Sequence, residues 1–182
     1  MLPGGESPDR LAFGEGTGGF RPLANFRTVI GSPSALTRAN VRLCWESWNP
    51  DLTELVNTFE GALAVAGVKR SQVSYLYTHG TGTAQNDAAE IGAAEKVFES
   101  GVTFVATKPL TGHCQGASAG VEAVLTARSF TDGVMPSVTP VASPYHALAA
   151  GTGPRRDGLV LKSAIGMGGF NSAVVFSPMT WG

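Results

Sequence analysis

Apolar residues recur at helical spacing between residues 52 and 66, which predicts an amphipathic helix that buries one face. Asp51 precedes this stretch as a candidate N-cap, and Gly67 follows it as a candidate C-cap. Two further helices, both rich in alanine, are expected over residues 87–100 and 116–130. The apolar positions of the first helix are Leu52, Leu55, Val56, Phe59, Ala62, Leu63 and Ala66.

Short β-rich runs alternate with these helices. The runs at 73–77 and 102–106 predict single strands, whereas those at 159–164 and 172–176 flank a glycine-rich turn and predict a hairpin. The order of helices and strands predicts a three-layer α/β arrangement, with a mixed, mostly parallel sheet between helices.

The pattern is weaker at the N-terminal end. Residues 1–25 are rich in glycine and proline and are expected to form a loop-rich lead-in. Residues 27–31 are typical of a strand, and residues 32–50 are expected to be irregular. The chain, residues 1–182, is interpreted as one domain.

Composition narrows the possible functions. Thirteen basic and 14 acidic residues give a net charge of −1, which argues against binding driven by nucleic-acid phosphates. Only 15% of residues are charged, so we expect much of the chain to be covered, either internally or by a partner. Cys44 and Cys114 form no CxxC pair and predict neither a disulfide scaffold nor a zinc site. No apolar run reaches about 18 residues, and no signal-peptide pattern occurs, so a cytoplasmic location is expected.

Two of the three histidines follow the two expected parallel strands. His79 begins HGTGT after strand 73–77, and His113 ends KPLTGH after strand 102–106. Because parallel strands joined by helices end at the same edge of a sheet, both loops should lie where ligands bind in α/β folds. The glycines beside each histidine permit close approach of a substrate. Together with Lys108, the two histidines indicate a catalytic site.

The segments that carry these residues resemble β-ketoacyl synthases, the condensing enzymes of the thiolase superfamily. HGTGTAQNDAAE at 79–90 is similar to their HGTGTxxxDxxE, and KPLTGHCQGASAGVEA at 108–123 to their KSxxGHxxGAAGxxEA. SAIGMGGFNSAVVF at 163–176 is similar to NSFGFGGTNAxLVF, and RLAFGEGTG at 10–18 to DGFVxGEGAG. The resemblance implies the C-terminal half of a thiolase-like fold, without the half that carries the nucleophilic cysteine.

The resemblance implies a role for individual residues. Four are implied to be catalytic: His79, His113, Lys108 and Glu122. Five are implied to bind substrate: Thr81, Thr83, Gly166, Met167 and Gly168. Glu122 is expected to pair with Lys108, and the two threonines to contact the pantetheine arm. Met167 stands where the family usually has a gating phenylalanine, which leaves the preferred acyl chain open. Cys114 does not match the nucleophile, and we expect a small buried side chain there.

The implied reaction is the decarboxylative Claisen condensation of malonyl-acyl carrier protein with an acyl thioester, in fatty-acid or polyketide biosynthesis. Two imidazole N–H groups would hold the oxygen of the enolate. No metal or diffusible cofactor is implied, because the phosphopantetheine belongs to the acyl carrier protein. The cysteine would come from another chain or segment, so a heterodimer is expected. The alternative is a non-catalytic partner subunit, similar to a chain length factor, that shapes the acyl tunnel.

A hydrolase fits the sequence less well. GASAG at 116–120 is a literal GxSxG motif, with Ser118 as the nucleophile and Asp132 and His146 following in order. That motif requires a strand leading directly into the first glycine, but nine residues, among them Pro109 and Gly112, separate it from strand 102–106. Nucleotide binding is weaker still, because no glycine loop fits GxGxxG at the start of a helix and no GK[ST] occurs.

Overall fold

Five strands form the central sheet of the computed structural model, which describes residues 38–43, 52–98, 101–138, 151–166 and 170–178. The strands are β1 (Arg38–Leu43), β2 (Val73–Tyr77), β3 (Thr103–Val105), β6 (Leu159–Gly166) and β7 (Phe170–Phe176). Their order across the sheet is β1-β7-β6-β2-β3. β2 runs parallel to both β3 and β6, whereas β7 is antiparallel to β1 and β6. The sheet is therefore mixed, with its parallel part around β2.

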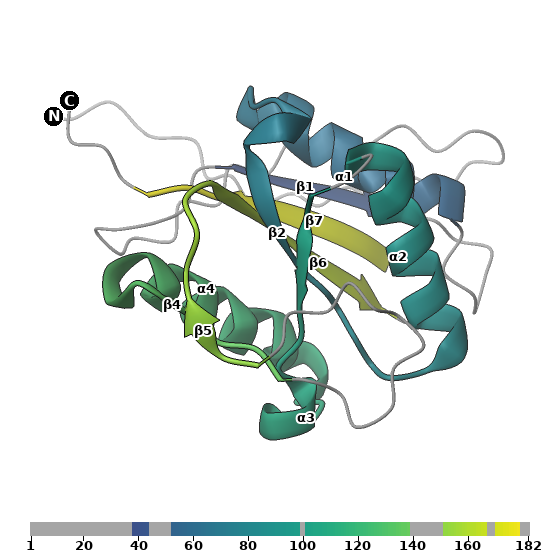
Figure 1. The fold of residues 1–182 in the computed structure, drawn as a ribbon. Coiled ribbons are helices and arrows are strands. Elements are labelled where there is room, and N and C mark those ends of the chain that lie inside the picture. The colour runs from purple at the N-terminus through teal and green to yellow at the C-terminus, as the bar shows by residue number, and fades with distance from the viewer. Residues whose placement is uncertain (1–37, 44–51, 99–100, 139–150, 167–169, 179–182) are drawn as a thin grey trace, which may run out of the picture.

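Helices cover both faces of this sheet. α1 (Leu52–Ala66) and α2 (Ala84–Phe98) lie on one face, and α4 (Ser118–Asp132) lies on the other (Figure 1). A short helix, α3 (Lys108–Thr111), follows β3, and a small ribbon of β4 (Val134–Met135) and β5 (Gly153–Pro154) lies beside α4. The expected three-layer α/β arrangement is confirmed.

Alternation along β2 divides the core between the two faces of the sheet. Leu76 packs into the cluster formed with α1 and α2, where Phe59 and Val97 are fully buried. Tyr75 and Tyr77 point to the opposite face and belong to the cluster completed by partly buried residues of α4. Each face of the sheet therefore has its own apolar layer, and β2 is covered on both sides.

The helices and the hairpin are close to their predicted positions. The first helix spans 52–66 as expected, and Gly67 ends it with φ +69°. The second begins at Ala84, three residues before its expected start. The third opens with a 3₁₀ turn at 115–117 and becomes α-helical at Ser118.

The prediction that residues 32–50 are irregular is wrong for residues 38–43, which form β1. Its sequence, RANVRL, alternates polar and apolar residues, a strand pattern that the prediction overlooked, and it pairs with β7 from the far end of the chain. The alternation indicates a strand, but it does not identify β7 as the partner. The strand expected at 27–31 and the lead-in at 1–25 lie outside the described residues.

The parallel pairing of β2 with β3 brings their two following loops to the same edge of the sheet, as the sequence predicts. β6, on the other side of β2, ends near the same edge, so three strands contribute residues there. Within the described part of the chain, no helix is long and apolar enough to cross a membrane.

Candidate active site

His79 lies two residues after the end of β2, and buried acceptors bind its backbone N–H. Its N–H donates to Glu90 Oε1 at 2.8 Å and to Ser163 Oγ at 3.1 Å. The N–H of Gly80 donates to the other Glu90 oxygen at 2.8 Å. Gly80 has φ +54°, and a Cβ there would lie 2.7 Å from Thr78 Oγ1, so the turn requires glycine. α2 and β6 thus fix the loop that carries His79.

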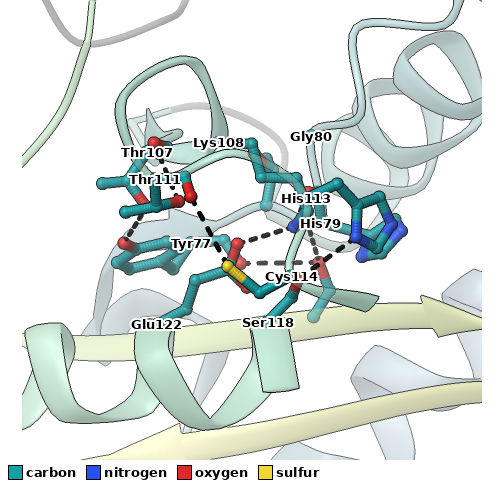
Figure 2. A network of polar contacts seen from close by, with 12 residues as sticks. Tyr77, His79, Gly80, Thr107, Lys108, Thr111, His113, Cys114, Ser118 and Glu122 are labelled. Atoms are coloured by element: carbon teal, nitrogen blue, oxygen red, sulfur yellow. Dashed lines mark hydrogen bonds and ion pairs between the residues drawn. The ribbon is translucent and has the colours of Figure 1, made fainter. Parts of the chain in front are cut away.

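His113 follows α3, and two contacts to Nδ1 set the orientation of its ring. The N–H of Gln115 donates to Nδ1 at 3.1 Å, and Ser118 Oγ lies 3.1 Å from the same nitrogen. Because a backbone N–H can only donate, Nδ1 accepts and the neutral ring carries its proton on Nε2. The rings of His79 and His113 meet edge to face, with centroids 5.4 Å apart and an interplanar angle of 81° (Figure 2).

Glu122 is a buried carboxylate shared by two lysines. Lys108 Nζ lies 2.6 Å from Glu122 Oε1, and Lys162 Nζ lies 2.8 Å from Oε2. All three side chains are buried. Lys108 also donates to the backbone carbonyl of His79, so it lies between His79 and Glu122 (Figure 2). This array connects α3, α4 and β6 to the loop that carries His79.

The surroundings of His79 keep its imidazole neutral. Burial, reinforced by the charges of Lys108 and Lys162 and by His113, lowers the pKa of His79 from 6.5 to about 3. At neutral pH the ring therefore offers an N–H donor without carrying a charge. A neutral donor next to a cationic lysine suits the stabilisation of an oxygen that becomes negative during a reaction.

The buried charges near the histidines compensate one another. Burial raises the pKa of Glu90, whereas hydrogen bonds from Gly80, Ser163 and the backbone of His79 oppose that shift. Burial lowers the pKa of Lys162, and the neighbouring Glu122 opposes it. Two carboxylates and two ammonium groups thus offset the cost of removing each from water.

The structure describes three of the five residues that are expected to bind substrate: Thr81, Thr83 and Gly166. The hydroxyl oxygens of Thr81 and Thr83 lie 3.1 Å apart, beside the loop of His79. Gly166 ends β6 and is exposed. Met167 and Gly168 lie outside the described residues. The contact of the threonines with a pantetheine arm stays a prediction.

Two expectations about single residues are corrected. Cys114 is exposed rather than buried, with its thiol 3.4 Å from the carbonyl of Thr111. Ser118 begins α4 after a 3₁₀ turn and α3, so no strand leads into GASAG as a hydrolase elbow requires. Its hydroxyl contacts His113, whereas Asp132 pairs with Arg128. The third member of that hypothetical triad, His146, lies outside the described residues.

Sequence reasoning missed three residues of this site: Glu90, Ser163 and Lys162. Glu90 ends the first motif, but nothing local assigns it to the backbone of His79. Lys162 did leave a signal, because a lysine interrupts an otherwise apolar run in LVLKSA. Its partner could be found only from the strand order, which places β6 beside β2.

The mixed α/β sheet, with paired histidines at the ends of its parallel strands, agrees with what comparisons with known proteins show, namely the ketosynthase class of fold. The family described as beta-ketoacyl synthase, C-terminal domain, matches residues 45–142. The chain belongs to this family. It is 37% identical over 126 residues to 3-oxoacyl-[acyl-carrier-protein] synthase I, chloroplastic, of Arabidopsis thaliana, covering 65% of this chain and 26% of that protein. It is 28% identical over 185 residues to nodulation protein E of Rhizobium sp. (strain N33), and this match covers 93% of this chain and 46% of that protein.

Solved ketosynthases share the fold. A ketosynthase from module 1 of the bacillaene synthase of Bacillus amyloliquefaciens aligns with a TM-score of 0.73 at 18% identity, over 82% of this chain and 30% of that one. A ketosynthase in complex with its chain length factor from Xenorhabdus doucetiae aligns with a TM-score of 0.70 at 26% identity. This alignment covers 82% of this chain and 40% of that one. The chain thus spans less than half the length of the relatives and structures that it resembles here.

Proposed function

We propose that this chain supplies the C-terminal half of a β-ketoacyl synthase active site, in which His79 and His113 stabilise the enolate formed from a malonyl thioester. The observation that carries the proposal is the meeting of these two rings, 5.4 Å between centroids, next to the buried pair of Lys108 and Glu122. The substrates would be malonyl and acyl groups on an acyl carrier protein. The phosphopantetheine arm then arrives with the carrier and is not a resident cofactor.

The geometry suits decarboxylation before condensation. The bond between the malonyl carboxylate and its α-carbon breaks, carbon dioxide leaves, and the electron pair moves onto the thioester oxygen. His113, with its proton on Nε2, and neutral His79 can each donate to that oxygen. Lys108 places a positive charge next to His79 and is held by Glu122. The α-carbon then attacks an acyl thioester, forming the new carbon–carbon bond and releasing a thiolate.

The acylated cysteine is proposed to come from a second chain or segment. An exposed apolar surface supports such a partner: Leu110 of α3 is 73% exposed and Val124 of α4 is 62% exposed. Val121 lies three residues before Val124 and therefore on the same side of α4. We call Leu110, Val121 and Val124 the α3–α4 surface. A cytoplasmic location for the assembled enzyme stays a prediction.

A non-catalytic subunit that shapes the acyl tunnel is the second candidate. One structural neighbour is a ketosynthase bound to its chain length factor, and this chain contains no counterpart of the nucleophilic cysteine motif. The buried array of Lys108, Glu122 and Lys162 beside the histidines argues against this candidate. A purely structural subunit has no need for a neutral His79 beside a paired lysine.

Release of carbon dioxide from malonyl-acyl carrier protein tests the catalytic proposal. The assembled synthase should lose about 100-fold or more in kcat with His79→Ala or His113→Ala, because each removes one donor to the developing oxyanion. His146→Ala, at the histidine to which no role is assigned, is the matched control. Equal rates for all three variants and wild type would favour the non-catalytic subunit.

A further inference from the structure

Among the residues that the structure describes, four ionisable side chains lie buried around the two histidines, two of each sign. Lys162 is 3% exposed, Lys108 8%, Glu90 1% and Glu122 2%. They come from four different elements: β6, α3, α2 and α4. Glu90 is engaged by the backbone of the His79 loop, and Lys108 by the carbonyl of His79. The contribution of Lys162 to the site is not explained by the enolate-stabilising roles given above.

Lys162 occupies the side of Glu122 that Lys108 leaves open. Glu122 Oε1 binds Lys108, and Oε2 binds Lys162 at 2.8 Å. The Lys162 ammonium also lies 5.7 Å from the centre of the Tyr77 ring and donates to the carbonyl of Ser163. Lys162 is thus anchored on β6 and β2, and its contact with the carboxylate joins α4 to the sheet.

Burying a carboxylate oxygen without a partner costs free energy. If Lys162 were absent, Glu122 Oε2 would therefore be more stable in contact with another cation. Lys108 is the nearest cation, because its ammonium already contacts Glu122 Oε1. Binding both oxygens of Glu122 would draw the Lys108 ammonium away from the carbonyl of His79. The hydrogen bond that couples Lys108 to the His79 loop would then be weakened.

We propose that Lys162 is a positioning residue, which holds Glu122 Oε2 and thereby keeps Lys108 hydrogen-bonded to the carbonyl of His79. This inference rests on the proposed function for its catalytic consequence, but its structural part stands without it. Lys162 touches no reacting atom, so its effect on the reaction passes through Glu122 and Lys108.

The ¹³C chemical shift of the His79 carbonyl reports directly on the hydrogen bond from Lys108. Lys108→Met, measured in the full chain, sets the shift for complete loss of that bond. Lys162→Met should move the resonance most of the way to that value, whereas Lys96→Met, at an exposed lysine of α2, should not move it. A folded Lys162→Met with the wild-type shift would overturn the proposal.

A double-mutant cycle separates a path through Glu122 from an independent effect. In a Glu122→Gln background, adding Lys162→Met should not move the His79 carbonyl resonance further. An equal displacement in both backgrounds would mean that Lys162 acts without Glu122, and the proposal would fail. Lys162→Gln is the second variant, neutral but with an amide N–H that can donate to Oε2, and it should stay near the wild-type shift. If neither Lys162 variant folds while Lys108→Met does, Lys162 is a structural residue and the proposal is wrong.

The assembled synthase supplies the catalytic readout. Lys162→Met should lower kcat for carbon dioxide release between about 10- and 100-fold, with KM within about twofold, because the donors are displaced rather than removed. Wild-type kcat in Lys162→Met, despite a displaced carbonyl resonance, would overturn the catalytic part. An inactive wild type with a displaced resonance in Lys162→Met would refute the proposed function and leave the structural part in place.

Discussion

The donor role proposed for both His79 and His113 depends on different local surroundings for each ring. His79 is 8% exposed, and its neutrality follows from burial among positive charges. His113 is exposed in the described structure, and its ring is oriented by contacts within its own loop. We therefore expect substitution of His79 to affect folding as well as the proposed chemistry, and substitution of His113 to affect mainly the proposed chemistry.

The low pKa of His79 predicts a pH-dependent contribution to stability. The unfolded imidazole takes up a proton below about pH 6.5, whereas the folded one does so only near pH 3. Between these values the unfolded state binds more protons, so stability rises with pH, by about 1.4 kcal/mol per pH unit at most. His79→Gln should lack this slope. Urea unfolding of both proteins between pH 4 and pH 7 measures the difference.

The comparison with His79→Gln is needed because Glu90 titrates with the opposite sign. A carboxyl whose pKa is raised by burial favours the folded state at low pH, and that effect is present in both proteins. Subtraction leaves the contribution of His79. Parallel stability curves for wild type and His79→Gln would show that His79 titrates normally in the folded chain.

The sequence motifs predicted those residues of the candidate site that lie inside the motifs themselves. His79, Lys108, His113 and Glu122 all lie in two short segments whose spacing resembles a known family. Lys162 could not be assigned in this way, because its role depends on a side-chain contact between β6 and α4. A charge in the middle of an apolar strand indicates a buried partner but does not name it.

At the scale of elements, the start of β6 determines how Lys162 and Ser163 reach the site. Gly158 precedes β6 with φ +118°, and a Cβ there would lie 2.0 Å from Ser74 Oγ and 3.1 Å from the carbonyl oxygen of Gln72. Ser74 Oγ in turn donates to the carbonyl of Asp157 at 2.5 Å. This close approach fixes β6 against β2.

Gly158→Ala should therefore destabilise the chain by about 3 kcal/mol, from backbone strain and steric overlap together. Ser74→Ala added to Gly158→Ala should restore part of this loss, because it removes the nearest atom but not the unfavourable φ. Gly120→Ala is the matched control on α4, where a Cβ would meet nothing within 4 Å. Denaturant unfolding measures all three variants, and equal stability of the two single alanine variants would contradict the argument.

Elements with a strong internal pattern were predicted well, and those that depend on distant pairing were not. α1 shows an apolar face with capping signals at both ends, and its bounds were predicted correctly. β1, in contrast, carries only a six-residue alternation of polar and apolar positions, and its pairing with β7 could not be predicted from that segment alone. The small β4–β5 ribbon was missed for the same reason.

At the scale of the whole molecule, the two faces of the sheet differ in how they are covered. α1 and α2 close one face with a continuous buried cluster. On the other face, α4 covers the sheet with one side and leaves large apolar side chains on its outer side. The cysteine-bearing partner proposed above is expected to bind to this exposed apolar side of α4.

The α3–α4 surface thus leads to a prediction about assembly. Val124→Asp or Leu110→Asp should change the stability of the isolated chain by less than about 0.5 kcal/mol, because both side chains are exposed there. The same changes should weaken binding of the cysteine-bearing half by about 30-fold or more, since each would bury an unpaired charge in an apolar interface. Ala88→Asp, at an exposed position of α2 on the opposite face, is the matched control. Titration by native mass spectrometry measures the affinity, and undiminished binding by Val124→Asp and Leu110→Asp would place the interface elsewhere.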